Sequence, residues 1–82
     1  MASDELDSLT AMICDHQRSA VFLDPFDADA RAQWLSTASL LLGAVQDPWE
    51  RFSYAHDLAI AVAMRCEEVC PSDVLNQFKK GW

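Results

Sequence analysis

Two Asp-Pro-aromatic stretches and a third proline divide this chain into segments that read as helices. Pro25 and Pro48 each follow an aspartate and precede an aromatic residue, in LDPFDAD and QDPWERF. Proline is tolerated at the first position of a helix, and it disfavours helical geometry in the residue before it. An aspartate in that preceding position can accept hydrogen bonds from free N–H groups of the first turn. We therefore interpret both stretches as helix starts.

Apolar residues between these breaks recur at the three-to-four spacing of helices that are packed on one side. The expected helices run from about Asp4 to Ala20, from Asp24 or Asp27 to about Val45, from Pro48 to about Val69, and from a Ser72 cap to the C-terminus. The expected inward residues of the first two are Leu6, Leu9, Ile13, His16, Ala20, Trp34, Leu35, Ala38, Leu41, Leu42 and Val45. The predicted fold is all-α, a small helical bundle with three main helices and a short fourth helix in a single domain, 1–82.

The third helix is expected to be the central one, because its middle, HDLAIAVAMRC, is apolar on nearly every side. Such a helix belongs in the centre of a bundle or at an interface. Ala55, Ala59 and Ala63 form a row of small residues that allows close helix approach, and Gly43 in helix two is expected to do the same. The surplus of apolar surface on this helix also predicts a homodimer.

The net charge of −7 is concentrated in residues 1–30, where seven acids against one base, Arg18, give −6. Such a surface repels nucleic acid and anionic lipid and favours a basic protein partner. The six basic residues of the chain are scattered, so no direct nucleic-acid binding is predicted. The alternative is that these acids only keep the protein in solution.

Three cysteines and two histidines are the candidates for a metal site or a catalytic dyad. Cys66 and Cys70 are expected one helical turn apart, with His56 near the same face, and Cys14 and His16 could complete a zinc site from helix one. Their spacing matches no zinc framework, and no glycine-rich or oxyanion-forming loop accompanies a cysteine. We predict no metal, no cofactor and no enzymatic activity, and we expect His56 to be a hydrogen-bonded core or interface residue.

Two other interpretations of the Asp-Pro-aromatic stretches are weaker than helix capping. They look like the short peptides that clathrin-adaptor appendage domains recognise, but those peptides work from disordered tails. Asp24, Asp27 and Asp29 suggest a calcium loop, but the stretch has no central glycine and Pro25 intrudes.

The cellular location is predicted from two absences in the sequence. The N-terminus lacks the pattern of a signal peptide, and the longest apolar run, LAIAVAM, is too short to span a bilayer. We expect a cytoplasmic protein with reduced thiols and no membrane partner.

Binding to another protein is the function that remains. Core packing accounts for Trp34, whereas Trp49 could be a staple or an exposed anchor, and Trp82 has no obvious structural need. In being tiny, acidic and helical, the chain resembles inhibitors carried by phages and mobile elements, including anti-CRISPR proteins. The resemblance implies a protein that occupies and blocks a basic nucleic-acid-binding surface of a larger protein. The predicted partner-binding residues are Asp4, Glu5, Asp7, Asp15, Asp24, Asp27, Asp29, Trp49 and Trp82.

The alternative function is a helical dimerisation or adaptor subunit, antitoxin-like or chaperone-like, that binds through the apolar third helix. The two functions differ in their dependence on salt, because a charge-based blocker should be salt-sensitive and an apolar adaptor nearly insensitive.

Overall fold

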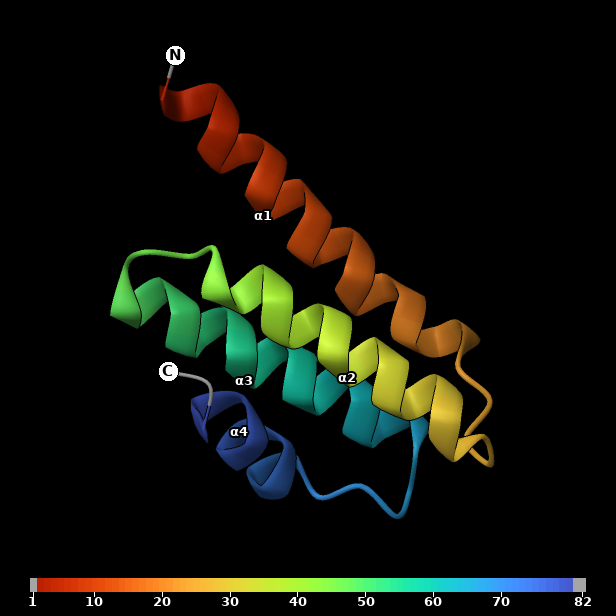
Figure 1. The fold of residues 1–82 in the computed structure, drawn as a ribbon. Coiled ribbons are helices and arrows are strands. Elements are labelled where there is room, and N and C mark those ends of the chain that lie inside the picture. Colours follow the sequence, from red (N-terminus) through yellow and green to blue (C-terminus); the bar gives the residue numbers. More distant parts are fainter. Residues whose placement is uncertain (1, 81–82) are drawn as a thin grey trace.

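Four helices make up the computed structural model, which describes residues 2–80 and their side chains from Ser8 onward (Figure 1). They are α1 (Ala2–Ser19), α2 (Ala28–Gly43), α3 (Pro48–Arg65) and α4 (Pro71–Lys80), and a 3-10 turn, η1 (Ala20–Phe22), extends α1. The described residues include no strand. The prediction of an all-α bundle with a short fourth helix is confirmed.

The start of α3 is fixed by Asp47. Its Oδ1 accepts the backbone N–H of Trp49 at 2.9 Å, and Pro48 is the first helical residue, which confirms the predicted cap. From the first turn of α3, Nε and Nη2 of Arg51 donate to the carbonyl of Val45, in the loop that joins α2 to α3, at 3.0 and 2.6 Å. Side chains therefore satisfy backbone groups that a helix end leaves without partners.

The start of α2 uses two aspartates in sequence. Asp24 Oδ1 accepts the N–H of Phe26 at 2.9 Å in the turn before the helix. Asp27 is the cap itself, and its Oδ1 accepts the N–H groups of Asp29 and Ala30, each at 3.1 Å. Of the two starts predicted for helix two, the structure has the later one.

The predicted end of helix three is wrong. The helix ends at Arg65, and Cys66 already has an extended backbone, with φ −116° and ψ 105°. The carbonyl of Cys66 then accepts the N–H of Val69 at 3.0 Å in a turn. The chain reverses here because the last helix folds back onto α3.

The last helix begins earlier than predicted. Pro71 is its first residue, so this proline starts a helix, and Ser72 lies inside the helix instead of capping it. The carbonyl of Cys70 accepts the N–H groups of Asp73 and Val74 at 3.1 and 3.2 Å. Proline fits the first helical position because its missing N–H would have no partner there.

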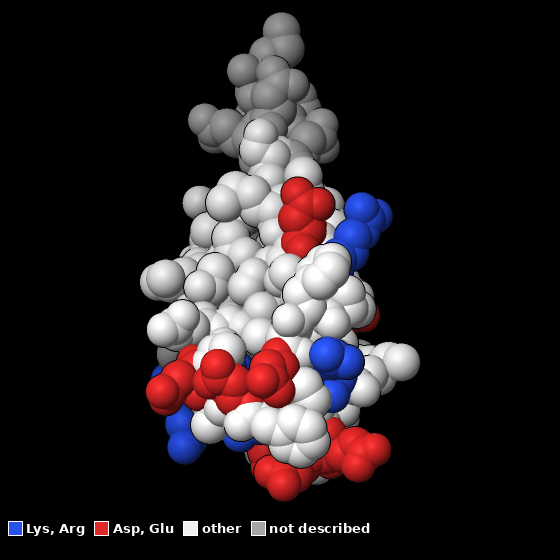
Figure 2. Space-filling view, turned by 90° about the vertical axis from the view of Figure 1, so that its right-hand side faces the viewer, with Lys and Arg blue, Asp and Glu red and all other residues white. Residues whose placement is uncertain are grey.

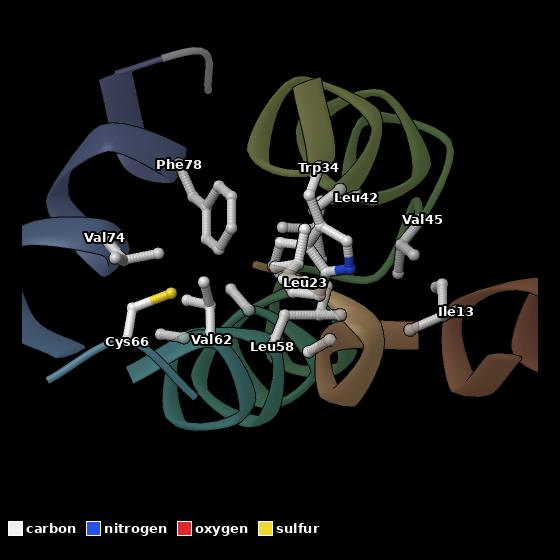
Figure 3. Close-up of a cluster of buried hydrophobic side chains, with 14 residues drawn as sticks. Ile13, Leu23, Trp34, Leu42, Val45, Leu58, Val62, Cys66, Val74 and Phe78 are labelled. Atoms are coloured by element: carbon white, nitrogen blue, oxygen red, sulfur yellow. The ribbon is translucent and has the colours of Figure 1, made fainter. Parts of the chain in front are cut away.

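The core lies around α3, which packs against α1, η1, α2 and α4 (Figures 1 and 3). Figure 3 shows Phe78 and Val74 of α4 pointing toward Val62 and Cys66. The buried apolar residues are Ile13, Ala20, Leu23, Trp34, Ala38, Leu42, Val45, Ala55, Leu58, Ala59, Val62, Cys66, Val74 and Phe78. The central position expected for the third helix is confirmed.

Of two further predictions about packing, the inward stripe of the first helix is confirmed and the close approach at Gly43 is not. Leu9, which is half-buried, and the buried Ile13 and Ala20 confirm the inward stripe of the first helix, whereas the side chain of Leu6 lies outside the described residues. The close approach predicted at Gly43 is wrong. Gly43 is exposed, and no atom that a Cβ would meet lies within 4 Å.

Polar contacts fasten the end of α1 to its neighbours. The indole Nε1 of Trp34 donates to the Ser19 hydroxyl at 2.9 Å and to the His16 carbonyl at 3.1 Å, while His16 Nε2 donates to the Trp34 carbonyl at 2.8 Å. The two rings stack with centroids 4.4 Å apart. Nε of Arg65 donates to the Leu23 carbonyl at 2.6 Å and so ties the chain after η1 to the end of α3.

None of the described helices combines the length and the apolar character needed to cross a lipid bilayer.

Candidate functional site

The residues considered for zinc binding or catalysis are dispersed in the fold. Cys66 is buried in the core and Cys70 is exposed, and both follow the end of α3, so they are not one helical turn apart on it. Cys14 is half-buried on α1, and His16 is held by Trp34. Among the side chains from Ser8 to Lys80, no three or more of His, Cys, Asp and Glu are placed to share a metal ion.

The expectation of a core position for His56 is wrong. His56 is exposed on α3. Its exposure leaves the other half of the expectation, a position at an interface, as a prediction.

The predicted acidic residues do not lie together. Asp4, Glu5 and Asp7 are in the first turns of α1, and their side chains are outside the described part of the chain. Asp24, with Asp27 and Asp29, follows the opposite end of that helix. From Asp4 and Asp7 to the end of α1 at Ser19, about 18–23 Å of helix separates the two groups. Asp15 lies between them and is exposed on α1.

The loops α1–α2 and α3–α4 meet at one end of the bundle, as the bond from Arg65 to the Leu23 carbonyl shows. We call this end the acidic loop end; its exposed carboxylates are Asp24, Asp27, Asp29, Glu67 and Glu68. Figure 2, which faces the right-hand side of Figure 1, shows carboxylates there in two groups, with uncharged surface and basic side chains between and beside them. Glu67 and Glu68 lie outside residues 1–30, the part of the sequence in which the negative charge is concentrated.

Two phenylalanines project from the acidic loop end. Phe22 closes η1 and is 86% exposed, and Phe26 lies in the turn before α2 and is 95% exposed. The backbone N–H of Phe26 is bound by Asp24 Oδ1, which holds the turn that carries the ring. An aromatic side chain with almost its whole area in water is a typical anchor for a partner protein.

Sequence reasoning missed both phenylalanines as candidate binding residues. Their position in the sequence could have indicated exposure. Each lies in the segment between two helices, VFLDPFD, where no helical periodicity directs a side chain to the core. Their exposure could have been suspected from this, but their proximity to Glu67 and Glu68 depends on the fold.

Trp49 is exposed on the opposite end of α3. It is 84% exposed, which excludes a buried staple and leaves the anchor that was the other interpretation. Pro48, Arg51 and Phe52 line a hollow of about 290 Å3 with it, and Lys79 Nζ lies 5.1 Å from the centre of the Phe52 ring. The remaining predicted anchor, Trp82, is outside the described residues.

A groove of about 650 Å3 lies between α1 with η1 and the C-terminal half of α3. Its apolar walls include Val21, Ile60 and Met64, and its charged side chains are Arg18 and Arg65. Among the side chains from Ser8 to Lys80, no carboxylate lines it. It is therefore a cationic, apolar surface on a chain whose net charge is −7.

Comparisons of this chain with protein-family models, with curated proteins and with solved structures gave no match.

Proposed function

We propose that this protein is a non-catalytic binding protein whose acidic loop end engages a basic surface of a larger protein. The observation that carries the proposal is the placement of Phe22 and Phe26, 86% and 95% exposed, at the end of the bundle that carries five carboxylates from two loops and the first turn of α2. Interfaces commonly join a few large apolar anchors to a polar rim. Here the anchors are aromatic, and the five carboxylates at this end outnumber its basic residues Arg18, Arg31 and Arg65, so the matching surface is apolar and cationic.

Basic surfaces of this kind occur on proteins that bind nucleic acid, where lysine and arginine meet phosphates. A group of carboxylates can take the place of the phosphates, and the bound protein would then exclude the nucleic acid. We therefore infer an inhibitor of the type that phages and mobile elements carry. We also place it in a reducing compartment, the cytoplasm, because Cys14, Cys66 and Cys70 are free thiols.

The test compares wild type with two variants of the acidic loop end. The partner is recovered by affinity purification, and its binding is measured by surface plasmon resonance at several salt concentrations. Phe26→Ala should weaken binding by about tenfold or more, as loss of an anchor does. Asp24→Asn/Asp27→Asn/Asp29→Asn should slow association and reduce its dependence on salt, because charge complementarity acts mainly on the association rate.

The matched control is Leu40→Ala, since Leu40 is a large apolar residue exposed on α2 away from this end. Asparagine still caps helices, so the triple variant keeps the start of α2. If the triple variant binds at the same rate with the same salt dependence, the acids only keep the protein in solution. If Phe26→Ala also binds like wild type, the interface lies elsewhere.

The second candidate function is that of a dimerisation or adaptor subunit that uses α3. It is favoured by Ile60 and Met64, two apolar residues of α3 that are exposed in the groove beside α1. Sedimentation at micromolar concentration should then show a dimer. A single species of 9.2 kDa would remove the homodimer.

A further inference from the structure

The groove between α1 and α3 joins apolar walls to two guanidinium groups. Met64 is 82% exposed, and Val21 and Ile60 are also exposed to solvent. Arg18 lies in the last turn of α1 and Arg65 in the last turn of α3, so both cations are at the same end of the groove. An anionic group bound there could meet both of them.

The two arginines differ in their contacts within the fold. Arg65 has a structural role, because its Nε binds the Leu23 carbonyl at 2.6 Å. The guanidinium of Arg18 has no hydrogen bond or ion pair within the part of the chain whose side chains are described. Its charge counters the negative end of the α1 dipole, but this effect is small at an exposed position. Arg18 is therefore available to a ligand.

We propose that this groove docks an amphipathic helix of a partner protein, with the apolar face of that helix on Val21, Ile60 and Met64 and its carboxylates on Arg18 and Arg65. Arginine suits this role because its planar fork of donors matches a carboxylate. The cationic end of this groove adjoins the acidic loop end, since Arg65 binds the Leu23 carbonyl there, but the groove is opposite in sign and extends along α1 and α3 to Cys14 and Ile60. The two proposals use different side chains and are tested by different variants.

The shape of the groove favours a helix over a small amphiphile. Binding sites for small molecules enclose most of the ligand surface, whereas the walls here, such as Met64, stand open to solvent. A helix needs to bury only one of its faces in a groove. A second copy of this chain is a poorer occupant, because a symmetric interface uses the same patch twice and no carboxylate lines this patch.

The test uses two labelled peptides of about 18 residues that form amphipathic helices. One carries leucine on one face with glutamates along both borders of that face, and its twin carries lysine in place of each glutamate. Binding is followed by fluorescence anisotropy. The acidic peptide should bind at least tenfold more tightly than the lysine twin. Nonspecific attraction would give the opposite preference, because the net charge of −7 favours the lysine peptide at long range.

Two surface variants with matched controls locate the peptide. Arg18→Glu should weaken binding of the acidic peptide about tenfold, whereas Lys80→Glu, the same change on α4, should alter it by no more than about twofold. Met64→Glu should weaken binding of the acidic peptide, because it replaces an apolar contact with a like charge, whereas Leu40→Glu should alter it by no more than about twofold. Phe26→Ala should leave the affinity for the acidic peptide unchanged, which separates this site from the acidic loop end.

The thiol of Cys14 gives a second measurement, since this half-buried residue lines the groove. The acidic peptide should slow alkylation of Cys14 and leave that of the exposed Cys70 unchanged. Three outcomes overturn the proposal. In the first, the acidic peptide binds no better than its twin or leaves Cys14 unprotected. In the second, dodecanoate, a small anionic amphiphile, protects Cys14 and the acidic peptide does not. In the third, wild type is a dimer that Met64→Glu dissociates, which makes a second copy of the chain the occupant.

Discussion

Replacement of Trp34 by phenylalanine tests how α1 is held on the bundle. Trp34 is 6% exposed, and its indole N–H donates to the Ser19 hydroxyl and the His16 carbonyl at 2.9 and 3.1 Å. Phenylalanine keeps an aromatic ring that can still stack on His16, and it removes the donor and part of the ring. The substitution therefore isolates the polar contacts and the lost volume from the stacking itself.

The expected loss of unfolding free energy is about 2 kcal/mol. Loss of the indole donor, which two acceptors share, costs about 1 kcal/mol net rather than the sum of two bonds, because the Ser19 hydroxyl still donates to the His16 carbonyl at 2.5 Å. The void left by the smaller ring, on the order of 40 Å3, adds about 1 kcal/mol at about 24 cal/mol per Å3. For a domain of this size the melting temperature should fall by about 8–16 °C.

The assay is urea denaturation followed by circular dichroism at the helical band, with wild type, Trp34→Phe and Trp49→Phe side by side. Trp49 is 84% exposed, so the same substitution there should change stability by less than about 0.5 kcal/mol. Equal losses in the two variants would refute the reasoning, because they would show that α1 is not held by the indole of Trp34.

Three further outcomes follow from local geometry. Asp47→Ala should lower the unfolding free energy by about 1 kcal/mol and Asp47→Asn by much less, as measured by thermal melting, because only the alanine variant loses the cap. Gly43→Ala should raise it by about 0.4–1 kcal/mol, since the site is open and its φ is not positive; a loss would show strain that the structure lacks. Ellman's reagent should react with Cys70 first, then Cys14, and with Cys66 only on unfolding, in the order of their exposure; the reverse order would contradict the described core.

Helix starts could be predicted from the sequence because a cap depends on adjacent residues. Asp47 and Pro48 are neighbours, and the bonds they make or omit involve only the first turn. The end of α3 could not be predicted in this way, since apolar residues continue to Val69. Proline at position 71 is compatible with a helix that ends before it and with a helix that starts at it. Only the packing of α4 against Cys66 decides between them.

Burial on α3 could be predicted only in part, for a related reason. Because this helix is apolar on nearly every side, its pattern does not say which side α1 and α4 cover. Leu58 and Val62 are buried, whereas Ile60 and Met64, two positions further along from each, are exposed. The groove is a property of two helices that lie far apart in the sequence, so neither helix pattern alone could reveal it.

The acidic surface shows most clearly how the fold changes what the charge pattern suggests. The seven acids of residues 1–30 form one stretch in the sequence, but about 18–23 Å of α1 lies between Asp4, Glu5 and Asp7 and the end of the helix that leads to Asp24. At physiological ionic strength charges are screened over about 8 Å, so the two groups act on a partner separately. The turn after α3 brings Glu67 and Glu68 to the same end of the bundle as Asp24. A partner of the proposed kind therefore meets five carboxylates from two loops and the first turn of α2, and its approach is steered by residues that lie more than 40 positions apart in the chain.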